Sequence, residues 1–381
     1  WPDFPYITQS VLLIEYAMWR SEPFMSPSGE AYITYSLGEH KETSAVRSDR
    51  FRRWLQYWYF RNYRRAPYNQ AMEEALRTIE AEAEFDGSVR PVPLRVAGEA
   101  RRNGQIYIDL CNDDWEVVEI TRNGWHIANP EEVSVRFRRT PGMDPLPHPV
   151  PGGSLETLPS FVRVQSEEEL ALLCAYLVQS LCPVGPYPIL TFTGEQGTGK
   201  STASRIIRAL VDPSPVPLRA CPTSESDLVV AANNGWILAY DNMDTLSDRM
   251  SNAFCRMATG GGFGTRKLYS TSEEQIFSAQ RPALLNGIAD IATRPDLRDR
   301  MLSVELQAIP PGQRRTESAL WKTLNEAHPY LFGALCNALS TALRRIESVQ
   351  IDRLPRMADF ARWAVAAEPT FPVPNGTFMK A

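Results

Sequence analysis

Apolar residues recur at helical spacing in the first part of this chain, then at every second position, and later at helical spacing again. Before residue 91 this pattern predicts three helices and one short strand. The helices are expected at residues 11–20, 51–65 and 68–84, and the strand at residues 31–35.

Alternating apolar and polar residues between Pro91 and Arg139 predict five short strands. Asn-Gly pairs that end at Gly104 and Gly124 favour tight hairpin turns within this stretch. We therefore expect residues 1–150 to form an N-terminal α+β accessory domain that contains an antiparallel β-module. Three acids in it are weighed as metal ligands, with ordinary strand-end and loop roles favoured: Asp109, Asp113 and Asp114.

A stretch rich in proline and glycine, residues 140–160, is typical of a linker. Ser166 followed by Glu169 is a capping box, which predicts a helix running to about Leu181. We assign residues 151–185 to this linker and helix. The rest is assigned to an α/β core and a C-terminal helical region, residues 186–310 and 311–381.

The apolar run Tyr187–Thr193 ends in a glycine-rich turn that leads into a helical pattern. Strand, G-x-x-x-x-G-K-S and helix, in this order, are the phosphate-binding loop in its required context. The glycines permit backbone angles at which several N–H groups converge on a phosphate, and the positive end of the helix dipole faces the same anion. The predicted phosphate-binding residues are Gly194, Glu195, Gln196, Gly197, Thr198, Gly199, Lys200, Ser201 and Thr202.

This loop predicts that ATP binds together with Mg²⁺. Lys200 is expected to reach the β- and γ-phosphates, and the Ser201 hydroxyl to complete the Mg²⁺ coordination. A second apolar strand pattern, residues 236–240, ends in Asp241, which fits a Walker B aspartate that holds Mg²⁺ through water.

The residue after Asp241 is Asn242, where many ATPases of this kind carry a glutamate that polarises the attacking water. Because an amide cannot take up a proton, the catalytic base stays open between Asp244 and Glu195. A third short apolar strand ends in Asn286. We expect this polar side chain to lie beside the γ-phosphate as a sensor.

Arg294, Arg298 and Arg300 precede a further apolar strand. Arginines so placed can reach a neighbouring subunit's γ-phosphate and stabilise the charge of the transition state. The alternative is a surface salt-bridge cluster with Asp296 and Asp299.

The order of these parts resembles an AAA+ ATPase of the superfamily 3 helicase kind. The closer similarity is to replication proteins of phages, plasmids and integrated elements, which are often fused to a primase, and it covers roughly residues 155–345. The resemblance implies a P-loop AAA+ fold and a ring, usually a hexamer, with ATP between subunits. It also implies that Lys200, Ser201 and Asp241 act in cis, that Asn286 is sensor 1, and that Arg300, with Arg298 second, is the arginine finger.

The same resemblance implies a basic hairpin that projects into the central channel and contacts single-stranded or forked DNA. Strand patterns at 266–269 and 275–278 predict such a hairpin, and it carries Arg266 and Lys267.

The net charge of −5 provides no global basic field for nucleic acid, so any such contact must come from a local patch. The segment 51–65 interleaves five arginines with aromatic residues, which suits a nucleic-acid backbone and stacked bases. The favoured alternative is an amphipathic helix that buries its aromatic residues and solvates its arginines.

The six cysteines are scattered, with no C-x-x-C pair, and no apolar run is long enough to span a membrane. We expect a cytoplasmic protein, in a bacterium or a phage-infected host. The chain begins at Trp1 without a methionine, and we expect it to be a fragment of a longer protein.

The predicted function is ATP-driven DNA unwinding or translocation in replication of a phage or mobile element. One alternative is an AAA+ ATPase that remodels protein, or an initiator or defence component that binds DNA without unwinding it. A small-molecule P-loop kinase is a third class, but it leaves the hairpin and the arginines unexplained.

Overall fold

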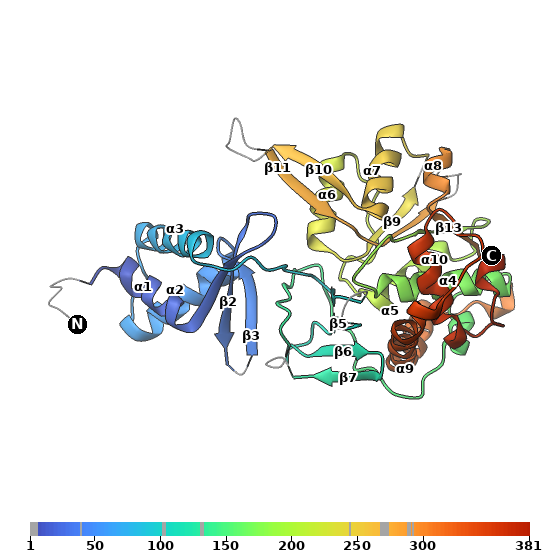
Figure 1. The fold of residues 1–381 in the computed structure, drawn as a ribbon, viewed down its shortest axis with the longest axis horizontal. Helices are drawn as coiled ribbons and strands as arrows, with labels where there is room; N and C mark the ends of the chain where they lie inside the picture. The colour runs from blue at the N-terminus through green and yellow to red at the C-terminus, as the bar shows by residue number, and fades with distance from the viewer. Residues whose placement is uncertain are drawn as a thin grey trace. The chain divides into compact units, whose positions relative to one another are not determined.

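The computed structural model describes residues 7–38, 40–100, 104–129, 133–243, 245–266, 274–287, 291 and 293–381 (Figure 1). The chain forms two compact units. The first comprises Trp1–Leu94 and Asn129–Arg139, and the second comprises Arg95–Ala128 and Thr140–Ala381.

The first unit packs three helices on a three-stranded antiparallel sheet of order β1–β2–β3. Its elements are α1 (Gln9–Arg20), β1 (Ser21–Met25), β2 (Ala31–Leu37), β3 (His40–Ala45), α2 (Asp49–Tyr63) and α3 (Asn69–Phe85). Ile33 and Tyr35 of β2 join apolar side chains of all three helices in one core, which includes Phe51 and Leu55 of α2. The three helices and the strand expected at residues 31–35 are thereby confirmed, whereas the sequence pattern did not predict β1 and β3.

The second unit is built on four parallel strands in the order β13–β8–β12–β9. The strands are β8 (Ile189–Thr193), β9 (Leu238–Met243), β12 (Ala283–Gly287) and β13 (Met301–Glu305). The helices are α4 (Glu167–Ser180), α5 (Lys200–Val211), α6 (Glu225–Asn234), α7 (Asp248–Thr259), α8 (Pro295–Arg298), α9 (Glu317–Arg345) and α10 (Ala358–Ala367).

Helices cover both faces of this parallel sheet (Figure 1). Successive side chains of a strand point to opposite faces. Leu190 and Leu284 accordingly pack with α4, α5, α9 and α10, whereas Ile189 and Leu285 pack with α6 and α7. Burial on both faces explains why the strand sequences are continuous apolar runs. The expected parallel sheet with flanking helices and the helical C-terminal region are confirmed.

The β-module is a four-stranded antiparallel sheet in the second unit, whereas the expected boundary at residue 150 placed it with the N-terminal helices. Its strands are β4 (Val96–Gly98), β5 (Ile106–Asp109), β6 (Val117–Thr121) and β7 (Gly124–Ala128). Its apolar face joins the core around α9. The Trp125 indole donates to Asn337 Oδ1 at 2.8 Å, and Ser340 Oγ donates to the Thr121 carbonyl at 2.8 Å.

The fifth strand expected in this region is absent from the described residues between 133 and 139. Arg138 instead forms an isolated bridge with Thr43, inside the first unit. This pairing explains why the short segment 129–139 returns to the first unit.

The proline- and glycine-rich stretch before α4 packs closely on α9 and contains a short 3-10 helix, η1 (Leu155–Ser160). The Val150 amide donates to the Pro329 carbonyl at 2.9 Å. A Cβ atom on Gly153 would lie 1.9 Å from the Tyr330 oxygen, and one on Gly333 would lie 2.0 Å from the Val150 oxygen. Glycine is therefore required where the two backbones cross.

A two-stranded antiparallel hairpin extends from the second unit, formed by β10 (Gly261–Arg266) and β11 (Glu274–Ala279) (Figure 1). Its first strand begins five residues earlier than the strand expected at 266–269, and that expected strand lies largely outside the described residues. None of the described helices is both long and apolar enough to cross a membrane.

Candidate functional site

The turn between β8 and α5 has the backbone shape of a phosphate-binding loop. Gly194, Gly197 and Gly199 have φ values of 131°, 86° and 85°, which side chains with a Cβ rarely adopt. A Cβ on Gly194 would also lie 3.1 Å from the Leu306 carbonyl oxygen. Gly199 is the N-cap of α5, so the positive end of the helix dipole faces the concave side of the turn.

Lys200 and Ser201 occupy the first turn of α5, below the glycine loop. The Lys200 ammonium donates to the carbonyl oxygens of Gly194 at 2.7 Å and Glu195 at 3.0 Å. The Ser201 hydroxyl donates to Asp241 Oδ1 at 3.0 Å, so residues 40 positions apart in sequence meet at the carboxyl ends of β8 and β9. The two predicted Mg²⁺ ligands therefore lie side by side.

Asn286 links this pair to the neighbouring strand. Its side chain is 2% exposed, and its Nδ2 donates to Ser204 Oγ on α5 at 2.9 Å. Its Oδ1 accepts the Asn242 N–H at 3.2 Å, and the same N–H lies 2.9 Å from Asp241 Oδ1. Asn242 takes the left-handed φ of 52°, which asparagine tolerates better than most residues. Asn286 therefore connects the ends of β9 and β12 to α5.

The structure does not choose between Glu195 and Asp244 as the catalytic base. Glu195 is exposed on the glycine loop, and Asp244 lies outside the described residues. Within the described ranges, no three His, Cys, Asp or Glu side chains are grouped closely enough to hold a metal ion. When phosphates and water supply most of its ligands, Mg²⁺ needs only one or two oxygens from the protein, and Ser201 and Asp241 provide a hydroxyl and a carboxylate.

Arg298 and Arg300 lie at the opposite edge of the sheet from the glycine loop. The Ile189 amide, at the start of β8, donates to the Arg300 carbonyl at 2.9 Å, whereas the loop follows the end of that strand. At about 3.3 Å per residue, the length of β8 separates these arginines from the chain's own phosphate site. Arg298 is exposed, whereas Arg300 is half-buried and donates to the Asp296 carbonyl.

Arg294, the N-cap of α8, forms ion pairs with two nearby carboxylates. It makes two hydrogen bonds of 3.0 Å to Asp296, and its guanidinium lies 3.5 Å from Asp248. The hydrogen bonds from Arg294 hold the pKa of the Asp296 carboxyl below its ordinary value. Arg294 therefore behaves as the salt-bridge alternative expected, although Asp299 pairs with Arg356 at 2.7 Å instead.

Of the two predicted DNA-binding residues, only Arg266 lies within the described residues. Arg266 is the last residue of β10, opposite Glu274 of β11, and Lys267 lies outside the described residues.

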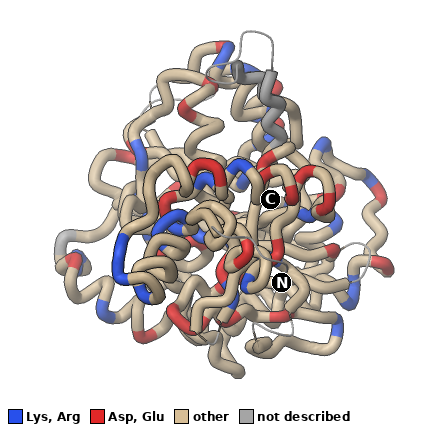
Figure 2. The backbone as a smooth tube through the Cα atoms, turned by 90° about the vertical axis from the view of Figure 1, so that its left-hand side faces the viewer, with Lys and Arg blue, Asp and Glu red and all other residues tan. Residues whose placement is uncertain are grey.

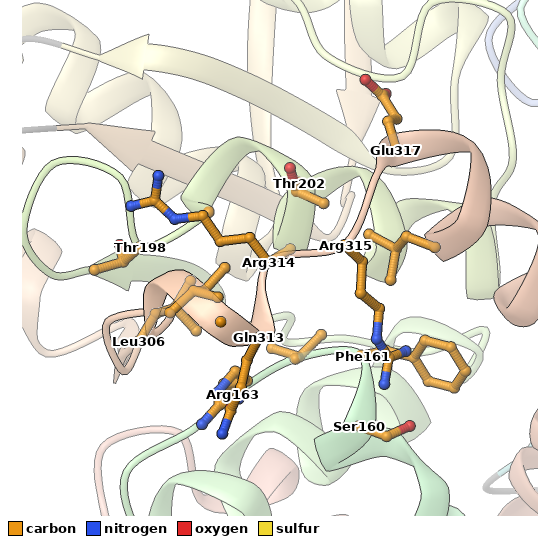
Figure 3. Close-up of a pocket in the computed structure, with 16 residues that line it drawn as sticks. Ser160, Phe161, Arg163, Thr198, Thr202, Leu306, Gln313, Arg314, Arg315 and Glu317 are labelled. Atoms are coloured by element: carbon orange, nitrogen blue, oxygen red, sulfur yellow. The ribbon is translucent and has the colours of Figure 1, made fainter.

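A cavity of about 530 Å³ adjoins the glycine loop. Three segments line it: residues 160–163 at the end of η1, the loop and first turn of α5, and residues between 306 and 320 that lead from β13 into the first turn of α9. Phe161, Ile309 and Leu320 supply apolar surface. Arg314 extends toward Thr198 of the loop, whereas Arg315 extends toward Phe161 (Figure 3).

The sequence did not identify the cavity residues outside the loop. Arg163 and Gln313 are 150 positions apart, yet Arg163 Nη1 donates to Gln313 Oε1 at 2.6 Å across the cavity wall (Figure 3). The one signal available was the adjacent pair Arg314-Arg315, just before the Thr316 cap of α9.

Comparison with known proteins gives one family. The model of the actinomycete integrative conjugative element replication protein family matches residues 154–370. No curated protein matches the sequence.

Solved structures that resemble the chain include three apo structures of the NrS-1 C-terminal region. The A form of residues 305–718 is 12% identical, covers 85% of this chain and 69% of its own, and has a TM-score of 0.44. A second A form has 11% identity, coverages of 96% and 75%, and a TM-score of 0.45. A third apo structure has 12% identity, coverages of 96% and 76%, and a TM-score of 0.46.

Proposed function

Because this chain belongs to the actinomycete integrative conjugative element replication protein family and acts in replication, we propose that it is an ATP-driven DNA helicase or translocase. In this proposal the second unit is a P-loop AAA+ ATPase core that hydrolyses ATP in the cytoplasm. Subunits assemble as a ring, a hexamer by the family resemblance, on single-stranded or forked DNA, with a primase fused or separate.

The contact between Ser201 and Asp241 is the observation that carries the ATPase proposal. A phosphate-binding loop alone does not require magnesium, but a hydroxyl in the first turn of α5 bonded to a carboxylate at the end of β9 offers the oxygens Mg²⁺ needs. When bound, Mg²⁺ would neutralise charge on the β- and γ-phosphates. Lys200 lies one residue from Ser201 and is positioned to bind the same phosphates.

The cavity beside the loop is suited to the base and ribose of the nucleotide. Its apolar wall, with Phe161 and Leu320, would hold the base, while the glycine loop holds the phosphates. Arg314, which extends toward Thr198, would add positive charge at the phosphate end (Figure 3). The proposed site thus extends along α5 from the cavity to Asp241.

Asn242 and Asn286 would hold and sense the water and γ-phosphate rather than take a proton, because amides donate and accept hydrogen bonds without titrating. The proton acceptor in the proposal is Glu195 or Asp244. Since Asn286 bonds to α5 and to the end of β9, loss of the γ-phosphate would alter contacts in both elements.

An arginine from the opposite sheet edge would complete a neighbouring subunit's site. Arg298 and Arg300 lie near the start of β8, whereas the glycine loop follows its end, so they are too far away to contact their own chain's phosphates. In a ring, an arginine in this position links hydrolysis to assembly. The β10–β11 hairpin would follow the phosphates of one DNA strand through Arg266 and Lys267.

The test is ATPase rate against protein concentration, with and without single-stranded DNA, alongside particle mass. We expect a rate that rises cooperatively with assembly and is stimulated by DNA. Lys200→Ala and Asp241→Ala should each lower hydrolysis at least about 100-fold, because both remove charge stabilisation at the phosphates. Lys322→Ala, which removes an exposed lysine on α9, is the matched control and should leave the rate unchanged.

Two outcomes contradict this proposal. An assembly-dependent rate that ignores DNA would identify a protein-remodelling ATPase instead. A rate independent of protein concentration, with phosphate transferred to a small molecule, would identify a kinase.

A further inference from the structure

The α2 helix of the first unit buries the aromatic side chains of one face and leaves those of the other face exposed toward its C-terminal end. Phe51, Trp54 and Leu55 belong to the core of the first unit. Tyr57 and Phe60, one to two turns later, are 61% and 47% exposed. Tyr59, which lies between them in sequence, is fully buried, so burial in the core accounts for one face of this helix and not for the face that carries Tyr57 and Phe60.

A second exposed aromatic group joins this end of α2 from α1. Trp19 is 76% exposed, and its ring lies 6.4 Å from that of Tyr16. Tyr16 stacks on Trp58 of α2 with ring centroids 3.9 Å apart and 10° between planes. Trp58 in turn contacts Tyr63 edge-to-face at 6.1 Å. The stacked pair thus fixes the end of α1 against α2 and supports the partly exposed rings of Trp19 and Tyr63.

The ion pairing of the arginines differs between the two ends of α2. Arg52 and Arg53, in its first turns, pair with Glu73 and Asp49. The exposed arginines at its C-terminal end, Arg61, Arg64 and Arg65, have no ion pair with any carboxylate among the described residues. This end of the helix therefore combines exposed aromatic rings with positive charge that the described part of the protein leaves uncompensated.

Two arginines are already arranged around aromatic faces. The Arg61 guanidinium lies 5.9 Å from the Tyr57 ring, and the Arg20 guanidinium lies 5.1 Å from the Trp19 ring. Tyr57, Phe60 and Arg61 follow helical i, i+3 and i+4 spacing, so they share one side of α2, and the exposed Arg64 is the C-cap of the helix. Positive charge beside exposed rings is the chemistry that binds phosphates and stacks unpaired bases.

We propose that this surface, defined by Tyr57, Phe60, Arg61 and Arg64, binds single-stranded nucleic acid. The rings stack on unpaired bases, and the arginines contact the backbone phosphates. The chain as a whole carries a net charge of −5, with charges of both signs interspersed along the backbone (Figure 2). The site therefore depends on this local group of residues and not on the overall field of the protein.

The proposal stands apart from the ATP site, since it involves only the first unit. Binding is therefore measured without nucleotide, on the whole chain, and repeated with Lys200→Ala. Loss of ATPase activity with retained binding would separate the two proposals. The probe is a labelled oligothymidylate of about 20 nucleotides, long enough to span a stacking surface, followed by fluorescence anisotropy.

Two double variants remove the two kinds of contact. Tyr57→Ala with Phe60→Ala should weaken binding at least about fivefold, because it removes stacking but no charge. Arg61→Ala with Arg64→Ala should also reduce the slope of log affinity against log salt by about 1.4, since each phosphate contact on a single strand contributes about 0.7. Arg77→Ala, an exposed arginine on α3, is the control and should change neither quantity.

Tyr57→Trp tests the mechanism without loss of a ring, and should keep or raise affinity. An oligomer of the same length without bases should bind the parent protein and the Tyr57→Ala, Phe60→Ala variant equally. The proposal is overturned if both double variants bind oligothymidylate like the parent while their thermal unfolding is unchanged.

Discussion

At the scale of single residues, Arg298 and Arg300 differ in how freely their side chains can reach a neighbouring subunit. Arg300 donates to the Asp296 carbonyl one turn earlier and is half-buried against the start of β13. Arg298 lies on the exposed side of the same turn. A side chain that must reach a neighbouring subunit has to extend into solvent, so exposure favours Arg298, the reverse of the order expected from the sequence.

We therefore predict that Arg298→Ala lowers ATP hydrolysis by about three orders of magnitude and leaves nucleotide binding intact, as loss of an arginine finger does. Arg300→Ala should have the smaller effect on hydrolysis. The measurement is ATPase rate together with binding of a fluorescent nucleotide. Mixing inactive Arg298→Ala subunits with inactive Lys200→Ala subunits should restore part of the activity, because some sites then combine an intact loop with an intact arginine. No recovery in the mixture would rule out action in trans.

Residues of the phosphate loop were predictable because their chemistry is local. The glycines, Lys200 and Ser201 are adjacent in sequence, and each residue type is required by the turn itself. The partner of Ser201 was predictable only as a strand-end acid, Asp241, and its contact distance came from the structure. Arg163 and Gln313 could not be found, since they are 150 positions apart and a pocket wall formed by distant segments leaves no characteristic spacing in the sequence.

At the scale of elements, the contact between α9 and α5 contains a buried titratable group. His328 of α9 lies beside Leu210 of α5, and burial lowers its pKa to about 4, although a hydrogen bond with the Leu210 backbone acts in the opposite direction. An unfolded chain would bind a proton near pH 6.5. Below that pH the unfolded state is protonated first, so His328 makes folding less favourable as the pH falls from about 6.5 to about 4.

We predict that His328 costs the folded state about 2 kcal/mol at pH 5 relative to pH 7, and about 3 kcal/mol once the pH is below 4. His328→Gln should remove that part of the pH dependence, since glutamine does not titrate. The check is urea unfolding of both proteins at pH 7 and pH 5. His126→Gln, which changes an exposed histidine on β7, should retain the parent dependence. Equal pH dependence in the parent and His328→Gln would show that this histidine is not the acid-sensitive group.

The elements themselves were predictable where apolar spacing was regular, as in α2, α3 and α9. The hairpin shows where local preference misled. Glycines at 260–262 and 264 argue against a strand, yet β10 begins at Gly261 because its backbone pairs residue by residue with β11. Such pairing is set by the partner strand, which local propensity does not include.

At the scale of the whole molecule, one buried ionic group joins the β-module to the α/β core. Arg95, just before β4, and Asp212, just after α5, are both 0% exposed, and Arg95 Nε lies 3.1 Å from Asp212 Oδ1. Asp212 also accepts the amides of Trp236 and Ile237, and Arg208 lies 3.8 Å away. Burial lowers the pKa of Arg208, and Asp212 opposes that shift.

This group explains why the division of the chain could not be predicted from its sequence. The proline-rich stretch after Arg139 has the composition of a linker between domains, which suggests that the β-module before it belongs to the N-terminal domain. The contact that places the module in the second unit joins Arg95 and Asp212, which are 117 positions apart and give no local sequence signal of their pairing. Arg95 further donates to the carbonyls of Asp109 and Asp144 at 3.0 Å and 2.7 Å, so the pair ties the module and the stretch that follows it to the end of α5. Domain membership here follows from tertiary contacts and not from composition.

Asp212→Asn should therefore destabilise the protein by about 3–5 kcal/mol, because it leaves two buried guanidinium groups without their counter-charge. Arg95→Met should cost less, since Asp212 would keep Arg208 and two backbone amides. Glu347→Gln, which breaks the exposed pair with Arg122, is the control and should change stability by less than about 1 kcal/mol. Chemical unfolding followed by tryptophan emission measures all three. If Asp212→Asn unfolds like the control, the buried pair does not hold the module to the core, and its apolar contacts with α9 must do so.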